Sequence, residues 1–200
     1  MIKVVFIDIG NVLVDFDIRK LLGAVVAQSG KTPQEALMGL LKTGIFEKYE
    51  KGLVTTPQFF ETVRAQLNYP GAFEAFRDSW NGIFIENAGG VEAFHALKKD
   101  KRVFLASNTN EMHFEHLEAR YPFIKQAHGA VLSHKVQARK PEPDFYRKAL
   151  AHAAVPAQEA LLIDDMQENI EGAREAGMQG VRFTDLAALR EALKPFGISI

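Results

Sequence analysis

The sequence predicts an α/β fold: a parallel β-sheet with helices on both faces, interrupted by an inserted helical cap. From about residue 86 onward, short apolar runs alternate with helical patterns, which is typical of a parallel sheet. One further apolar run, Val4 to Ile7 within VVFIDIGNVL, stands alone near the amino terminus. We therefore expect a core of residues 1–14 and 86–200 and a helical cap of residues 15–85.

Composition limits the kinds of partner. The chain has 200 residues, 47% hydrophobic and 24% charged, with a net charge of -1 and no cysteine. A nearly neutral chain has no clustered cations to attract nucleic acid or an anionic membrane, and the lack of cysteine excludes disulfides and thiolate metal sites. No apolar run reaches the length of a membrane span. We expect a soluble, cytoplasmic protein with no nucleic-acid or membrane partner.

The insert has start signals and apolar spacings typical of helices. Its expected helices begin at Asp17 (ending near Gly30), Thr32-Pro33, Thr56-Pro57 and after Pro70-Gly71. The aromatic residues of these helices are expected to form the core of the insert rather than to bind a ligand. They include Phe59, Phe60, Phe73, Phe76 and Trp80.

The second half of the chain contains the remaining elements of the sheet. Strands are expected over residues 102–106, 129–132, 160–163 and 180–183. Helices are expected over residues 90–99, 111–120, 143–154 and 168–176, with Asp185 as the cap of a last helix. Since the insert leaves the chain directly after the first strand, it is expected to cover the carboxyl edge of the sheet as a lid.

Polar residues follow the expected strands at the points where they end. Asp8 ends the first strand, Ser107 and Asn108 follow the second, and Asp164-Asp165 follows a later one, while Lys140 comes after the strand at 129–132. The carboxyl ends of parallel strands meet at one edge, where α/β proteins place their ligands. A carboxylate, a hydroxyl, a lysine and an acidic pair at this edge predict a phosphoryl-transfer site.

Each residue type suits that chemistry. Crowded carboxylates repel one another, and Mg²⁺ relieves the repulsion while offering positive charge to a phosphate. Asp8 can attack phosphorus to give an aspartyl-phosphate, which water then hydrolyses. Ser107 can donate a hydrogen bond to a phosphoryl oxygen, and Lys140 can neutralise charge in the transition state.

These motifs resemble those of the haloacid dehalogenase-like hydrolase superfamily, in order and over essentially the whole chain. They are D-I-G-N-V-L from Asp8, S-N-T from Ser107, R-K-P from Arg139, and Asp164-Asp165 with Asn169. The D-x-G-N-V opening resembles more closely the small phosphatases that act on sugar phosphates such as α-glucose 1-phosphate. The resemblance implies a Rossmann-like core, and a Mg²⁺-dependent phosphomonoesterase acting on a small phosphorylated metabolite, with a sugar phosphate favoured.

Carried over by position, the resemblance makes Asp8 the nucleophile and Lys140 the motif lysine. It assigns phosphate binding to Ser107, Asn108, Lys140, Gly10 and Asn11. It assigns Mg²⁺ to Asp8, the main-chain carbonyl of Gly10 and Asp165, with Asp164 either a second ligand or an outer partner.

Gly10 departs from the family pattern. Most phosphatases of the superfamily have at this position a second aspartate, which acts as general acid and base. Its loss should cost roughly a hundredfold to ten-thousandfold in rate with poor leaving groups. An anomeric or acyl phosphate should suffer least, and Asp15 is a modest candidate for a replacement.

Several alternatives stay open at this point. A neutral residue at position 10 suits a metal-independent 2-haloacid dehalogenase, and a phospho-ligand-binding protein with weak catalysis is a further possibility. Asn169 could face the site or pack within the fold, and Glu47, Tyr49 and Glu50 could reach substrate from the cap. His113 and His116 suggest a surface pair. The sequence leaves monomer or homodimer undecided.

Overall fold

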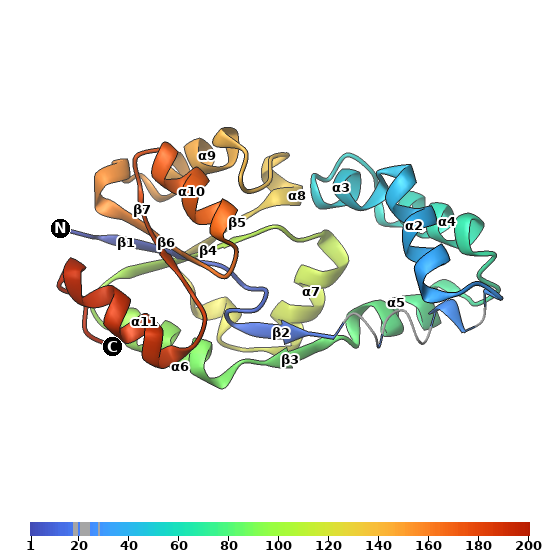
Figure 1. The fold of residues 1–200 in the computed structure, drawn as a ribbon, viewed down its shortest axis with the longest axis horizontal. Coiled ribbons are helices and arrows are strands. Elements are labelled where there is room, and N and C mark those ends of the chain that lie inside the picture. Colours follow the sequence, from blue (N-terminus) through green and yellow to red (C-terminus); the bar gives the residue numbers. More distant parts are fainter. Residues whose placement is uncertain (18–19, 21–24, 28) are drawn as a thin grey trace.

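The computed structural model describes residues 1–17, 20, 25–27 and 29–200. Within this part of the chain the main sheet has five parallel strands (Figure 1). Their spatial order is β5 (Gly129–Leu132), β4 (Arg102–Ser107), β1 (Val4–Ile7), β6 (Ala160–Asp164) and β7 (Gln179–Arg182). In the central strand, Val4 lies opposite Arg102 on one side and Ala160 on the other. The predicted parallel α/β sheet is confirmed.

Helices cover both faces of the sheet because alternate residues of each strand point to opposite sides. Val5 and Ile7 pack in the apolar cluster formed with α6 (Ala88–Leu97), α7 (Glu111–Arg120) and α11 (Leu186–Leu193). Val4 and Phe6 pack in the cluster formed with α9 (Pro143–Ala153) and α10 (Gln167–Glu175). The two layers lie below and above the sheet in Figure 1.

The helices of the core begin close to their predicted positions. The first of them, α6, starts two residues earlier than expected because the Asn87 side chain accepts a hydrogen bond from the Gly90 N–H at 3.0 Å. Asp185 caps α11 as predicted, accepting from the Ala188 N–H at 2.9 Å. A short helix that the sequence did not predict is α8 (Ser133–Val136). Among the described residues, no helix has both the length and the apolar character needed to cross a membrane.

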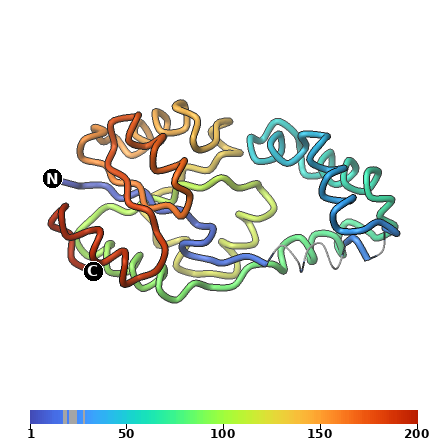
Figure 2. Tube along the Cα trace, viewed as in Figure 1, coloured from blue at the N-terminus to red at the C-terminus, as the bar shows by residue number. Residues whose placement is uncertain are grey.

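The insert forms a helical bundle beside the carboxyl edge of the sheet (Figures 1 and 2). Its described helices are α2 (Pro33–Thr43), α3 (Ile45–Glu50), α4 (Thr56–Leu67) and α5 (Phe73–Asn81). The bundle has an apolar cluster of its own, in which Phe59 and Phe76 are fully buried. The prediction that the aromatic residues form the core of the insert is therefore confirmed for these two.

Local sequence explains where the helices of the bundle begin. Thr32 and Glu35 form the predicted capping box at the start of α2. The prediction for α4 was wrong by one residue, because Thr55 is the cap and forms its capping box with Gln58. The helix predicted from Asp17 lies largely outside the described residues, although Val25 and Val26 are helical and buried.

The chain enters and leaves the insert through two short antiparallel strands, β2 (Val14–Phe16) and β3 (Phe84–Glu86). The sequence predicted no strand between Val14 and Asn87, and this was wrong. Three-residue strands are too short to show the alternation by which strands are recognised. The proposed boundaries at residues 14/15 and 85/86 fall within this strand pair, which holds the two crossing segments side by side.

Candidate active site

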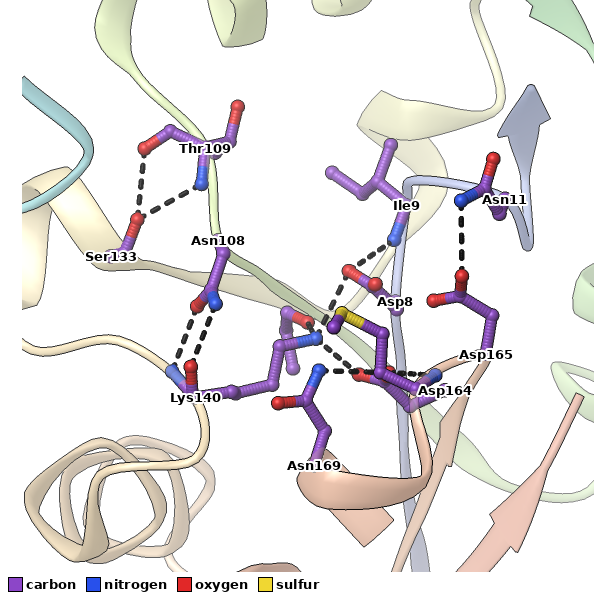
Figure 3. Close-up of polar contacts among 12 residues, drawn as sticks. Asp8, Ile9, Asn11, Asn108, Thr109, Ser133, Lys140, Asp164, Asp165 and Asn169 are labelled. Carbon is purple, nitrogen blue, oxygen red and sulfur yellow. Dashed lines mark hydrogen bonds and ion pairs between the residues drawn. The ribbon is translucent and has the colours of Figure 1, made fainter. Parts of the chain in front are cut away.

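The nucleophile candidate lies directly after the central strand. The Asp8 N–H donates to the Ile163 carbonyl at 2.9 Å, which continues the pairing of β1 with β6 by one residue. The Asp8 side chain is largely buried, and its Oδ1 accepts from the Ile9 N–H at 2.7 Å (Figure 3). Burial raises the pKa of Asp8 to about 7, although the positive charge of Lys140 opposes the rise.

Lys140 links the two carboxylates at the bottom of the site. Its Nζ lies 3.1 Å from Asp8 Oδ1 and 2.5 Å from Asp164 Oδ2, and it donates to the Ala106 carbonyl at 2.7 Å (Figure 3). An ammonium group has three N–H donors, so these contacts use all of them. Burial alone lowers the pKa of Lys140, but the charges of Asp8 and Asp164 outweigh burial and raise it. The lysine is therefore a fixed, buried cation.

Asp164 has its carboxylate fully enclosed by protein groups. Oδ2 contacts Lys140, and Oδ1 accepts from the Met166 N–H and from Asn169 Nδ2, both at 2.9 Å. Of the two possibilities left open for Asn169, the structure confirms that it faces the site. Lys140, the Met166 N–H and Asn169 thus engage both oxygens of the Asp164 carboxylate.

Asp165 completes an acidic cluster at the edge of the sheet. Among the described residues, Asp8, Asp164 and Asp165 each place one carboxylate oxygen within 4.8 Å of the others. Lys140 balances one of these three charges, which leaves the cluster with an excess of negative charge that a divalent cation would neutralise. The oxygen donors thus fit Mg²⁺. Asn11 donates from Nδ2 to Asp165 Oδ2 at 3.0 Å, so its side chain positions this carboxylate.

Asn108, in the segment after β4, contacts the main chain of Lys140 with its side chain. Asn108 Oδ1 accepts from the Lys140 N–H, and Asn108 Nδ2 donates to the Lys140 carbonyl, both at 2.8 Å. This two-point contact fixes the main chain of the buried lysine. Ser107, the preceding residue, is buried and lines the cavity described below.

Ser133 also shapes the site, in a role that the sequence did not reveal. Its Oγ donates to the Thr109 carbonyl at 2.8 Å and accepts from the Thr109 N–H at 2.9 Å, and the residue is fully buried. Ser133 thereby holds the loop that follows Ser107 (Figure 3). Its place directly after β5 was the available signal, but a serine at a strand end is too common to carry a prediction alone.

A cavity of about 350 Å³ lies between the core and the cap. Gly10, Ser107 and Asn108 line it from the core. Of the cap residues considered as substrate contacts, Tyr49 and Glu50 line the cavity, whereas Glu47 forms an ion pair with Lys51 at 3.0 Å. Burial raises the pKa of Glu50, and the nearby Arg139 opposes the rise.

Gly10 leaves no acid beside the nucleophile. A Cβ atom at this position would lie 3.3 Å from Cε1 of Phe16, so the Phe16 ring occupies the space next to it. Asp15 does not fill the gap, because its Oδ1 accepts from Asn87 Nδ2 at 3.1 Å and it is absent from the described residues that line the cavity. The structure therefore offers no support for Asp15 as a replacement acid.

Polar contacts join the cap to the core around the cavity. Lys51 pairs with Glu142 at 2.6 Å, and Thr56 Oγ1 donates to Glu111 at 2.8 Å. The prediction that His113 forms a surface pair was wrong. Its ring stacks on Trp80 of the cap at 4.9 Å between centroids, and its Nε2 lies 3.1 Å from the Trp80 carbonyl.

Comparison with known proteins agrees with this fold. D-ribitol-5-phosphate phosphatase from Bacteroides thetaiotaomicron is 26% identical, over 90% of each chain. Flavin mononucleotide hydrolase 1 from Arabidopsis thaliana is 24% identical, over 84% of this chain and 68% of its own. A Bacteroides thetaiotaomicron enzyme of the same family, solved with magnesium and inorganic phosphate, has a TM-score of 0.84 at 23% identity and covers 92% of this chain and 96% of its own. The family model for haloacid dehalogenase-like hydrolases matches residues 31–183, and the chain belongs to this family.

Proposed function

We propose that the protein is a Mg²⁺-dependent phosphomonoesterase that acts on a small phosphorylated metabolite through an aspartyl-phosphate on Asp8. The observation that carries the proposal is the ion-paired set of Asp8, Lys140 and Asp164, with Asp165 beside it, next to the cavity that Ile9, Gly10 and Ser107 line. The phosphatases among the relatives support the reaction class.

The contacts of Asp8 indicate which oxygen attacks. Oδ1 is held by the Ile9 N–H and by Lys140, whereas Oδ2 has no hydrogen bond from the described residues. In the first step Oδ2 forms a bond to phosphorus, the bond from phosphorus to the ester oxygen breaks, and the released alkoxide takes a proton from water to leave as the alcohol. In the second step water attacks the aspartyl-phosphate, which releases inorganic phosphate and restores Asp8. Lys140 stabilises the charge of the phosphoryl group throughout, and Ser107 donates to one of its oxygens.

The acidic cluster would hold the metal. We assign direct contact to Asp8, the Gly10 carbonyl and Asp165, and an outer position to Asp164, because Lys140, Asn169 and the Met166 N–H already engage its carboxylate. When bound, Mg²⁺ supplies positive charge to the phosphoryl oxygens. Asn11 keeps Asp165 turned toward this position through its hydrogen bond.

The missing acid at Gly10 restricts the leaving group. The alcohol has to depart without a proton from a side chain at position 10, so esters of more acidic alcohols should react faster. A sugar 1-phosphate meets this condition better than a 6-phosphate. The relative that acts on D-ribitol 5-phosphate supports the sugar or polyol phosphate favoured by the sequence, whereas the cavity walls favour a less polar alcohol.

The dehalogenase alternative has less support. A site that attacks carbon needs no cation, yet the described residues bring three carboxylates together with only one lysine to balance them. A binding protein without turnover would need no attacking oxygen, but Asp8 Oδ2 is left without a hydrogen bond from the described residues beside the cavity. Both alternatives remain outcomes of the test.

The test is release of inorganic phosphate from a panel of phosphorylated metabolites, with Mg²⁺ and with a chelator. We expect release that depends on Mg²⁺ and that falls by at least about a thousandfold in Asp8→Asn, which keeps the size of the side chain but removes the nucleophile. Asp165→Asn should instead raise the Mg²⁺ concentration needed for half-maximal release, because one carboxylate ligand is lost. Full activity of Asp8→Asn would overturn the mechanism, and release of halide from a 2-haloacid in the chelator would favour the dehalogenase.

A further inference from the structure

The cavity is polar at one end and apolar over most of its wall. Ser107, Asn108 and the Gly10 main chain form the end nearest to Asp8. The wall toward the cap and the β2–β3 strand pair is formed largely by aliphatic and aromatic side chains. Among them are Phe16, Leu37, Leu41, Phe46, Trp80 and Phe84. A phosphate placed at the polar end would therefore leave the rest of the substrate against apolar surface.

Three of the described polar side chains in the wall, those of Tyr49, Asn110 and His113, are hydrogen-bonded within the protein, and Glu50 is ion-paired with Arg139 at 3.4 Å. The buried Trp80 Nε1 has no hydrogen-bond partner among the described residues. The Tyr49 hydroxyl lies 2.8 Å from Thr56 Oγ1. Asn110 Oδ1 accepts from the His113 N–H at 3.0 Å, and the His113 ring nitrogens contact Asn110 Nδ2 and the Trp80 carbonyl. A polyol in this cavity would find few free partners for its several hydroxyl groups, and each hydroxyl left unpaired costs free energy.

The surroundings of the scissile bond are apolar as well. Where most phosphatases of the superfamily would have an acid, Gly10 has no side chain, and a Cβ atom placed there would lie 3.3 Å from the Phe16 ring. The Phe16 ring is 44% exposed, so a substrate can still bury part of it. Apolar surface thus begins directly beside the nucleophile loop and continues into the cap.

We propose that the alcohol portion of the substrate is an apolar ring system, aromatic or alicyclic, rather than a sugar or polyol. This rests on the proposed phosphatase function and narrows its substrate class. The cavity of about 350 Å³ is of the size that holds a small ligand, for which volumes of roughly 300 to 1,000 Å³ are usual. Burial of the ring against the wall supplies the binding free energy, while the phosphate orients it.

The first test compares two esters of unactivated alcohols, cyclohexyl phosphate and D-ribitol 5-phosphate, with Mg²⁺ and the wild-type enzyme. We expect kcat/KM to be at least about tenfold higher for cyclohexyl phosphate, because the ring is buried without loss of hydrogen bonds. A higher value for D-ribitol 5-phosphate would overturn the inference and leave the phosphatase function intact. If neither ester released phosphate, the proposed function would fail, and the binding test below would decide the inference.

Binding can be measured without turnover. Trp80 is the only tryptophan in the sequence and lines the cavity, so its fluorescence reports occupancy. In Asp8→Asn with Mg²⁺, we expect cyclohexyl phosphate to change this fluorescence with a dissociation constant at least about tenfold below that of D-ribitol 5-phosphate. Equal or tighter binding of the polyol ester would overturn the inference.

A matched pair of variants tests whether the apolar cavity wall binds the substrate. Leu41 is 54% exposed and lines the cavity, whereas Leu53 is 58% exposed and is not among the described lining residues. Leu41→Gln should raise KM for cyclohexyl phosphate roughly three- to tenfold with kcat unchanged, and Leu53→Gln should leave both at wild-type values. Equal effects of the two variants, or none at Leu41, would contradict the assignment of the wall to substrate binding. Equal melting temperatures would show that both variants fold.

Discussion

The core edge and the cap differ in the kind of side chain that they bury. At the core edge, burial is combined with charge: Lys140 and Asp164 are almost wholly enclosed and are held by several hydrogen bonds each. In the cap, burial is almost purely apolar, with Phe59, Phe76 and Trp80 in mutual ring contact. The core therefore fixes the position of individual atoms, whereas the cap supplies shape and apolar surface.

The largest loss of activity and stability is expected from substitution of Lys140. Lys140→Met should lower kcat by about a thousandfold or more, because the cation that faces the phosphoryl group is lost. It should also lower the free energy of unfolding by about 3 to 5 kcal/mol, since Asp8 and Asp164 lose their buried partner. Phosphate release and urea unfolding measure the two effects. The control is Lys148→Met, in which the replaced lysine pairs with Asp144 at 2.6 Å on the surface, and a similar loss there would contradict the contrast.

Removal of a buried aromatic ring from the cap should destabilise the cap and leave the sheet unaffected. Phe76 is fully buried against Phe60 and Trp80, with ring centroids 5.2 and 5.6 Å away. Phe76→Ala should cost about 3 to 5 kcal/mol, confined to the insert because its apolar cluster is separate from those of the sheet. Hydrogen exchange should show lost protection in α4 and α5 while β1 and β6 stay protected.

The matched variant in the core is Phe145→Ala, which removes a buried ring from the cluster that the sheet forms with α9 and α10. It should expose β1 and β6 to exchange instead. If Phe76→Ala exposed the sheet to the same degree, the cap and the core would form one cooperative unit and the contrast drawn above would not hold.

A smaller, pH-dependent loss of stability is expected at His113, where the core contacts the cap. Burial lowers the pKa of His113 from 6.5 to about 3. Its ring therefore stays neutral in the folded protein, and in the unfolded chain it takes up a proton below about pH 6.5. The unfolded state binds more protons as pH falls, so stability is fully present above that pH and declines as pH falls toward 3. We expect a loss of about 1 to 2 kcal/mol by about pH 5.

Unfolding measured between neutral pH and about pH 5 checks this decline. His113→Asn should flatten it, because the titrating ring is gone, whereas His95→Asn at an exposed position should not. An unchanged slope in His113→Asn would show that another group dominates the acid sensitivity of the protein.

The features of this molecule that depend on short-range sequence pattern could be predicted. The strand runs, the Thr32 capping box and the placement of Asp8 at a strand end all follow from local periodicity and residue type. The roles of Asn108 and Ser133 do not, because each depends on a partner more than twenty residues away in the sequence. The β2–β3 pair was missed because three residues carry too little pattern. The apolar cavity wall depends on how the cap is seated over the edge of the sheet, which local pattern does not specify.

The central place of β1 has a consequence for how the chain folds. This strand precedes the other described strands of the sheet in the sequence, yet its neighbours β4 and β6 begin at residues 102 and 160. Its four apolar residues, VVFI, must therefore wait for partners until most of the chain has emerged, while the helices of the insert can pair with near neighbours at once. Contacts so distant in sequence make sheet formation the slow event. The nucleophile at the end of β1 thus acquires its surroundings only after β6 has emerged.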